Sequence, residues 1–167
     1  VISGGVSPNV SVGLHTDSST ADKSCVFVTP SSVADDDPQA HFDFTDMSTF
    51  SADEYKYLTI VAKTTASNNA AGMYFCAGGI KDPVANCYKA WTWNNDGLWH
   101  EYVIDLSDLS LWTGTANKIR FDFFEGTTAA SSSLMLHSMK FTRTAPNTAS
   151  VSTDSTSYVV DESITIN

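Results

Sequence analysis

The chain is acidic, because 9 Lys and Arg stand against 19 Asp and Glu among its 167 residues, and the formal net charge is −10. This balance opposes binding to nucleic acid, which depends on cationic contacts with phosphate, and it opposes binding to an anionic membrane surface. The length suits one domain with a short extension, and no apolar stretch is long enough to cross a bilayer. We therefore expect no nucleic-acid partner and no insertion into a membrane.

Alternating and β-rich runs recur along the chain, and almost no segment has the periodicity of a helix. Turn-forming stretches separate these runs, and a short helical turn is compatible with 48–53. The pattern predicts an all-β fold, a jelly-roll β-sandwich of about eight antiparallel strands. In chain order the predicted strands are 24–29, 40–44, 57–63, 72–77, 88–93, 101–105, 118–124 and 134–141.

The three cysteines, Cys25, Cys76 and Cys87, form no metal-binding motif, because no CxxC pair occurs and the four histidines are scattered. Their odd number allows at most one internal disulfide. Cys76 and Cys87 lie near opposite ends of a predicted hairpin loop and are the natural pair. Three reduced, buried thiols are the alternative.

The strand pattern stops at 143–149, where Pro146 interrupts the chain and Ser and Thr dominate. We therefore assign 1–145 to the β-sandwich module and 146–167 to a linker and the first strands of a following domain. The final run, 157–166, resembles the opening of the immunoglobulin-like domains of bacterial surface proteins, which implies a longer modular protein. A terminal strand that pairs back onto the main domain is the alternative.

A series of short motifs follows in the second half of the module. Trp99-His100 begins a strand that ends in the acidic turn Asp105-Leu106-Ser107, and Trp112-Thr113-Gly114 comes next. An I-R-F-D strand at 119–122 and a closing strand at 136–141 complete the order. This order resembles the C-terminal half of galactose-binding-domain-like β-sandwiches, which include many carbohydrate-binding modules. The resemblance implies a jelly-roll domain that binds polysaccharide and belongs to an extracellular protein, secreted or attached to the cell surface.

Trp99 and Trp112 match positions that this family repeats, so we assign both to the fold. Trp91 and Trp93 do not belong to the shared pattern, which makes them candidates for a ligand site. Residues two apart in a strand point the same way, so these two indoles share one face. Two indoles on a solvent-facing sheet form an exposed apolar patch, and such patches mark interaction sites.

The pairing of the cysteines extends this face. If Cys76 faces Cys87 across the hairpin, Tyr74 shares the surface of Trp91 and Trp93. Aromatic planes suit sugars, because the C–H face of a pyranose is apolar and stacks on them. Polar side chains close enough to hydrogen-bond to sugar hydroxyls complete the predicted ligand-binding site: Lys89, Asn94, Asn95 and Asp96. The alternative is that both tryptophans pack under a loop such as 77–86.

The spacing of the two tryptophans also favours one kind of glycan. Residues two apart lie about 7 Å apart along a strand, which matches an extended β-1,4 chain poorly. The expectation is therefore a starch-like α-glucan, slightly favoured over a plant cell-wall β-glycan.

The sequence does not predict an enzyme. None of Glu54, Glu101, Glu125 and Glu162 lies in a recognisable catalytic motif, and a G-x-S-x-G elbow, a zincin signature and a phosphate-binding glycine loop are absent. We therefore expect a non-catalytic polysaccharide-binding module. A structural or protein-docking domain, an adhesin or spacer of a bacterial surface assembly, is the alternative.

We expect no cofactor to be required. Where the family often has Asp in its closing strand, which can help to hold a structural calcium ion, this chain has His137. Calcium prefers hard oxygen ligands, so this residue disfavours a family-type calcium site while leaving it open. The acidic turn at 35–37 is better explained as a solvated run of charges.

Overall fold

The structure is a computed structural model that describes residues 10–16, 24–30, 38–43, 50–75, 85–116, 118–126 and 132–146. Within these ranges no helix is long and apolar enough to cross a membrane. In chain order the elements are β1 (Val10–Thr16), β2 (Ser24–Pro30), β3 (Gln39–Asp43), β4 (Phe50–Ser51), β5 (Tyr57–Thr64), β6 (Ala70–Tyr74), the 3-10 helix η1 (Ala85–Cys87), β7 (Tyr88–Thr92), β8 (His100–Asp105), β9 (Thr115–Ala116), β10 (Lys118–Asp122) and β11 (Leu134–Thr142).

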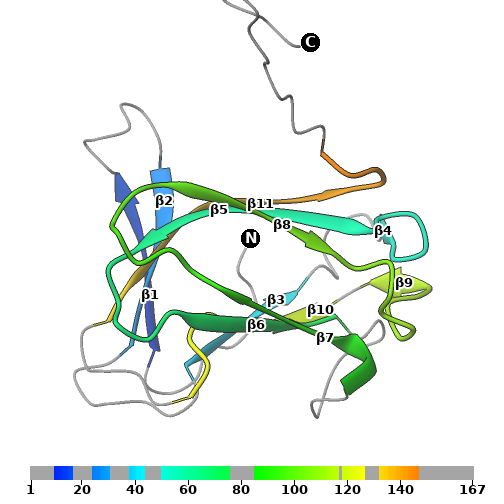
Figure 1. Cartoon of the computed structure of the whole chain (residues 1–167), viewed down its shortest axis with the longest axis horizontal. Helices are drawn as coiled ribbons and strands as arrows, with labels where there is room; N and C mark the ends of the chain where they lie inside the picture. Colours follow the sequence, from blue (N-terminus) through cyan, green and yellow to red (C-terminus); the bar gives the residue numbers. More distant parts are fainter. Residues whose placement is uncertain are drawn as a thin grey trace, which may run out of the picture.

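In the described ranges two large antiparallel sheets form the two layers of the fold, and Figure 1 shows β6, β7 and β10 in one layer with β5, β8 and β11 in the other. The first sheet has five strands in the order β1-β2-β11-β5-β8, and the second has four in the order β3-β10-β6-β7. Strands β4 and β9 pair separately. The chain passes repeatedly between the sheets, as from β5 to β6 and from β7 to β8. The predicted all-β sandwich is confirmed.

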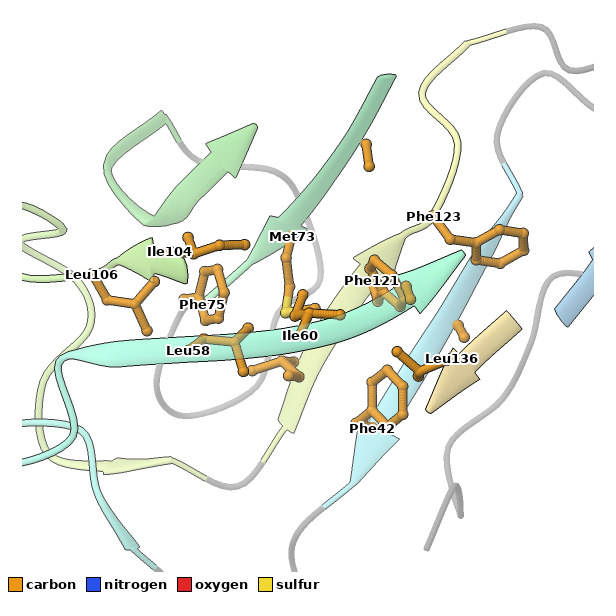
Figure 2. Close-up of a cluster of buried hydrophobic side chains, with 14 of the residues drawn as sticks. Phe42, Leu58, Ile60, Met73, Phe75, Ile104, Leu106, Phe121, Phe123 and Leu136 are labelled. Atoms are coloured by element: carbon orange, nitrogen blue, oxygen red, sulfur yellow. The ribbon is translucent and has the colours of Figure 1, made fainter. Parts of the chain in front are cut away.

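Strand β5 shows why the two sheets pack together. Its side chains alternate, so that Leu58, Ile60 and Ala62 are buried while the residues between them face outward. A period of two presents one apolar face to the opposite sheet. Figure 2 shows Leu58 and Ile60 in one cluster with Phe75, which follows β6, and Phe121 of β10. Each large side chain buried in this way contributes about 1.5–3 kcal/mol to folding.

Trp112 holds the corner that leads into β9, in keeping with its assignment to the fold. Its side chain is fully buried, and its indole N–H donates to the carbonyl of Tyr55 at 2.7 Å. Its ring packs against Phe75 and Phe141, with centroid distances of 5.5 and 5.8 Å. Gly114 then adopts a φ of +71°, which residues with a side chain rarely adopt. The tryptophan and the glycine therefore make a structural corner.

All eight predicted strands are present, and their ends differ from the prediction by at most three residues. The sequence prediction omits β1, although Val10, Val12 and Leu14 alternate there, and it omits β4 and β9, which have two residues each. The helical turn predicted at 48–53 is wrong in part, because β4 occupies its centre. A single turn follows, in which the N–H groups of Glu54 and Tyr55 donate to one carbonyl at 3.1 and 3.2 Å.

Three predictions involve residues beyond the described ranges. Cys87 is disulfide-bonded, which rules out the alternative of three reduced thiols. Cys76 lies outside the described residues, so its pairing with Cys87 stays a prediction. Residues 147–167 also lie outside them, and the domain division at 145 and the immunoglobulin-like start stay predictions.

Candidate functional site

The register between β6 and β7 decides which aromatic side chains face the core. Placing Cys76 opposite Cys87, as predicted, would put Tyr74 on the same face as Trp91. In the structure Tyr74 lies opposite Tyr88, one residue out of that register. A one-residue shift moves every side chain of a strand to the other face of the sheet. Tyr74 and Trp91 therefore lie on opposite faces, and the prediction of one shared surface is wrong.

Both tryptophans of this hairpin face the core. Trp93 is 1% exposed, its indole N–H donates to the carbonyl of Phe123 at 2.8 Å, and its ring meets Tyr102 edge-on at a centroid distance of 4.7 Å. Trp91 is half-buried and stacks on Phe121 with centroids 6.0 Å apart and ring planes inclined by 17°. The predicted pair of exposed indoles is wrong, and the packing that holds them comes from β8, from β10 and from the residues after β10.

The polar residues predicted to line the site do not gather around Tyr74. Lys89 is half-buried, and its ammonium group pairs with Oδ1 of Asp108 at 2.5 Å. Its cross-strand partner is Met73, a core residue, so Lys89 belongs to the core side of the sheet edge. The remaining three lie in the exposed loop between β7 and β8: Asn94, Asn95 and Asp96. This loop begins at the end of β7, which lies roughly 13 Å along the strand from the first residue of β7.

A row of four side chains crosses the outer face of the four-stranded sheet. Tyr88 of β7 lies opposite Tyr74 of β6, Tyr74 lies opposite Arg120 of β10, and Arg120 lies opposite His41 of β3. All four side chains are half-buried. The neighbouring row across the same strands consists of Ala90, Gly72, Asp122 and Gln39. We call these two rows, together with Glu125 just after β10, the tyrosine face.

Tyr88 leans across the neighbouring strand. A Cβ atom at position 72 would overlap the ring and hydroxyl of Tyr88 and the carboxylate of Glu125, so Gly72 leaves the room that both need. The Tyr88 hydroxyl donates to Oε1 of Glu125 at 2.5 Å. Burial raises the pKa of Tyr88 well above its ordinary value, and the hydrogen bond to Glu125 raises it further. The phenol therefore keeps its proton.

Tyr74 is supported from the other side by an ion pair. Asp122 is 1% exposed, and Nε and Nη2 of Arg120 donate to its two oxygens at 2.6 and 2.8 Å. This two-point contact fixes the guanidinium group, which lies 5.1 Å from the centroid of the Tyr74 ring. The Tyr74 and Tyr88 rings lie 4.6 Å apart and are inclined by 35°. The Tyr74 ring therefore has a neighbour on both sides, Arg120 on one and Tyr88 on the other.

His41 ends the row at β3. Its Nε2 lies 3.3 Å from Oε1 of Gln39. Burial lowers the pKa of His41, and the positive charges of Lys118 and Arg120 lower it further. The imidazole is therefore neutral at pH 7, where one ring nitrogen donates a hydrogen bond and the other accepts one.

The tyrosine face offers aromatic surface beside hydrogen-bonding groups of both kinds. Half-buried rings contact flat apolar ligand surfaces, and the guanidinium, carboxylate and imidazole groups around them bind polar substituents. The described part of the chain holds no group of three or more His, Cys, Asp or Glu side chains that could bind a metal ion. The acidic turn at 35–37 lies outside that part.

Sequence reasoning found one residue of the tyrosine face, Tyr74, and missed the others. A signal for two of them is present, because Arg120 and Asp122 alternate with the apolar Ile119 and Phe121 in a strand that the sequence predicts. The face on which Tyr88 lies depends on the register of β7 against β6, and no sequence pattern fixes that register.

No family model matches this sequence, and no curated protein matches it. Among solved structures, the chain is similar to the xylan-binding module of family 86 from Roseburia intestinalis, with a TM-score of 0.50 and 14% identity over 83% of this chain and 92% of that one. It is similar to the family 11 carbohydrate-binding module of Clostridium thermocellum in complex with a β-1,3-1,4-mixed-linked tetrasaccharide, with a TM-score of 0.55 and 12% identity over 86% and 89% of the chains.

A third similar structure is the glycoside hydrolase domain of Endo-D from Streptococcus pneumoniae, with a TM-score of 0.56 and 14% identity. The match covers 84% of this chain but 21% of that one. Identities this low show the fold alone. The fold is that of carbohydrate-binding-module jelly rolls. The resemblance inferred from the motifs at 99–122 is confirmed at this level.

Proposed function

We propose that the chain is a non-catalytic carbohydrate-binding module of a secreted or cell-surface modular protein, and that the tyrosine face binds the polysaccharide. The observation that carries this proposal is the row of Tyr88, Tyr74, Arg120 and His41 across four strands. A pyranose has an apolar C–H face, which stacks on aromatic rings, and hydroxyl groups at its edge, which need donors and acceptors. The row supplies both kinds of contact.

We propose a β-linked glycan of the xylan or mixed-linkage β-glucan type as the ligand. The preference for starch depended on two exposed indoles, and the burial of Trp93 removes that argument. Of two structures of similar fold, one is a xylan-binding module and the other is in complex with a β-1,3-1,4-mixed-linked tetrasaccharide. A row across four strands spans roughly 14 Å, from three gaps of about 4.8 Å each. That length suits a short stretch of an extended chain.

The carboxylates of the tyrosine face support binding without hydrolysis. A glycosidase needs one carboxyl group as a proton donor and a second as base or nucleophile on the two sides of the scissile bond. Asp122 is buried beneath Arg120, which donates to both of its oxygens, and Glu125 accepts a hydrogen bond from the Tyr88 hydroxyl. Both carboxylates thus hold the side chains that would contact a sugar.

Native affinity electrophoresis tests this proposal. The wild type and a Tyr74→Ala/Tyr88→Ala variant are run through gels that contain xylan, mixed-linkage β-glucan, mannan or starch. We expect retardation of the wild type by xylan or mixed-linkage β-glucan and its loss in the variant. The matched control is Tyr57→Ala, because Tyr57 is a half-buried tyrosine on the outer face of the other sheet.

Each outcome of this experiment decides between functions. Retardation of both the wild type and the Tyr57→Ala control, without retardation of the double variant, supports the proposal. Retardation that survives in the double variant places the ligand elsewhere. Absence of retardation in every gel, with circular dichroism showing folded protein, contradicts glycan binding and favours a structural or protein-docking role.

A further inference from the structure

The contact between Tyr88 and Glu125 restricts what this end of the tyrosine face can bind. A phenol has one proton, and Tyr88 donates it to Oε1 of Glu125 at 2.5 Å. The oxygen of Tyr88 can then only accept a hydrogen bond from a ligand, and a carboxylate likewise has no proton to give. The raised pKa of Tyr88 keeps the proton in place. The side chains of Tyr88 and Glu125 therefore present acceptors and no donor to a ligand.

The surroundings favour this position of the two side chains. The backbone N–H of Glu125 donates to the carbonyl of Ala70 at 2.8 Å, and Nδ2 of Asn68 donates to the Glu125 carbonyl at 2.8 Å. Gly72 leaves room for the Tyr88 ring in this position, and the Tyr74 ring lies against its other side. Groups with a fixed position lose little conformational entropy when a ligand binds, and they adapt poorly to a ligand of the wrong polarity.

We propose that Tyr88 and Glu125 form an acceptor-only edge that binds a free hydroxyl group of the glycan and discriminates against chains that are O-acetylated at that position. This inference rests on the proposed glycan-binding function. A free hydroxyl group donates a hydrogen bond to the edge. An acetyl ester has no hydroxyl proton to donate, and its own oxygens, which are acceptors, would face two other acceptors. The ester also leaves the remaining lone pairs of both acceptors without water or a donor.

The opposite end of the row responds differently to esterification. Arg120 lies in the row, and Lys118 lies two residues before it in β10, close enough to His41 to lower its pKa. Both carry donors, and an ester retains oxygens that accept from such groups. Acetylation therefore weakens binding mainly where the sugar meets Tyr88 and Glu125. The selectivity depends on the polarity of this one edge, and changing that polarity should remove it.

The test compares one glycan in two states. The glycan is whichever of xylan and mixed-linkage β-glucan retards the wild type in the gels. One sample of it is deacetylated with alkali and another is chemically O-acetylated. Isothermal titration calorimetry measures the affinity of the protein for each sample. We expect the acetylated glycan to bind about tenfold more weakly, the loss typical of unpaired polar groups. Glu125→Gln keeps an acceptor for the Tyr88 hydroxyl and adds an amide donor, so its ratio of affinities should fall toward one. Glu101→Gln, an exposed position on the other sheet, should keep the wild-type ratio.

The outcomes separate this inference from the function on which it rests. Equal binding of both glycan states by the wild type overturns the acceptor-only edge and leaves glycan binding intact. A tenfold ratio that Glu125→Gln retains also overturns it, because the selectivity would then arise elsewhere. If neither glycan retards the wild type in the gels, the proposed β-glycan ligand fails, and if no gel retards it, glycan binding itself fails.

Discussion

The two faces of the β6–β7 hairpin carry aromatic side chains with different roles. On the inner face, Trp93 is 1% exposed and bonded to a backbone carbonyl, and Trp91 stacks on Phe121. On the outer face, Tyr74 and Tyr88 are half-buried and are held by polar neighbours. Residue type alone does not distinguish them, because both pairs are large aromatics in predicted strands. The difference teaches that strand register decides which pair stabilises the fold and which pair is available to a ligand.

The largest expected effect comes from truncating one aromatic residue on each face. Trp93→Ala should lower the free energy of unfolding by about 3–5 kcal/mol, because it empties a core site. Tyr74→Ala should lower it by about 1 kcal/mol and abolish glycan retention. Urea unfolding followed by circular dichroism measures the first quantity. Equal destabilisation by the two changes would contradict the conclusion that the inner aromatic side chains stabilise the fold while the outer ones are available to a ligand.

The ion pair beneath the tyrosine face should matter next. Asp122→Asn leaves the half-buried Arg120 without its countercharge, and we expect a loss of about 3 kcal/mol in the free energy of unfolding. The matched control is Asp108→Asn, since Asp108 pairs with Lys89 but is 71% exposed. That change should alter the free energy by less than about 1 kcal/mol. Similar losses from both would show that burial of Asp122 is not the source of its effect.

Gly72→Ala should separate binding from stability. The added methyl group overlaps the Tyr88 ring and Glu125 on the outer face, so Tyr88 must move out of the row. We expect a loss of about 1–3 kcal/mol in the free energy of unfolding together with loss of glycan retention in the affinity gels. Ser138→Thr, which also adds a methyl group but at an exposed position of β11 in the other sheet, serves as the control and should affect neither. Normal retention by Gly72→Ala would mean that the position of Tyr88 is not critical.

The smallest expected effect is a dependence on pH through His41. Its pKa in the folded protein is lowered below the ordinary 6.5 by burial and then by Lys118 and Arg120. Below pH 6.5 the unfolded chain therefore binds more protons than the folded one, and the free energy of unfolding falls as the pH decreases. We expect His41→Gln to reduce this fall between pH 6.5 and 5.5, by less than about 1 kcal/mol because the ring is half-buried. Urea unfolding at both pH values measures it, and an unchanged slope would contradict this assignment.

The fold was predictable because its signals are local. The period-two pattern of β5 identifies a half-buried strand without knowledge of its neighbours, and the corner at Trp112 and Gly114 appears as a short motif. The ends of β6 were less predictable, since Phe75 stays buried after the strand pairing stops. The alternation of apolar and polar residues indicates which side chains are buried, whereas the end of a strand is set by its hydrogen bonds to the neighbouring strand.

The binding face was predictable only in part, because it is assembled from four strands. Tyr74, Arg120 and Asp122 each lie on the outer face of a predicted strand, but their adjacency requires the order β3-β10-β6-β7. The prediction that Trp91 and Trp93 share an exposed surface with Tyr74 was wrong because it assumed that Cys76 faces Cys87. That assumption sets the register of β6 against β7 one residue away from the observed one. Local patterns carry neither strand order nor register.

The placement of the indoles has an optical consequence. Trp93 and Trp112 are fully buried, and Trp91 faces the core. Trp99 lies just before β8, next to a lysine and a histidine of the other sheet. None of them belongs to the tyrosine face, so tryptophan fluorescence of the native protein follows unfolding and stays nearly constant when that face is occupied. A Tyr88→Trp substitution would place an emitting ring at the face and convert ligand occupancy into a change of wavelength.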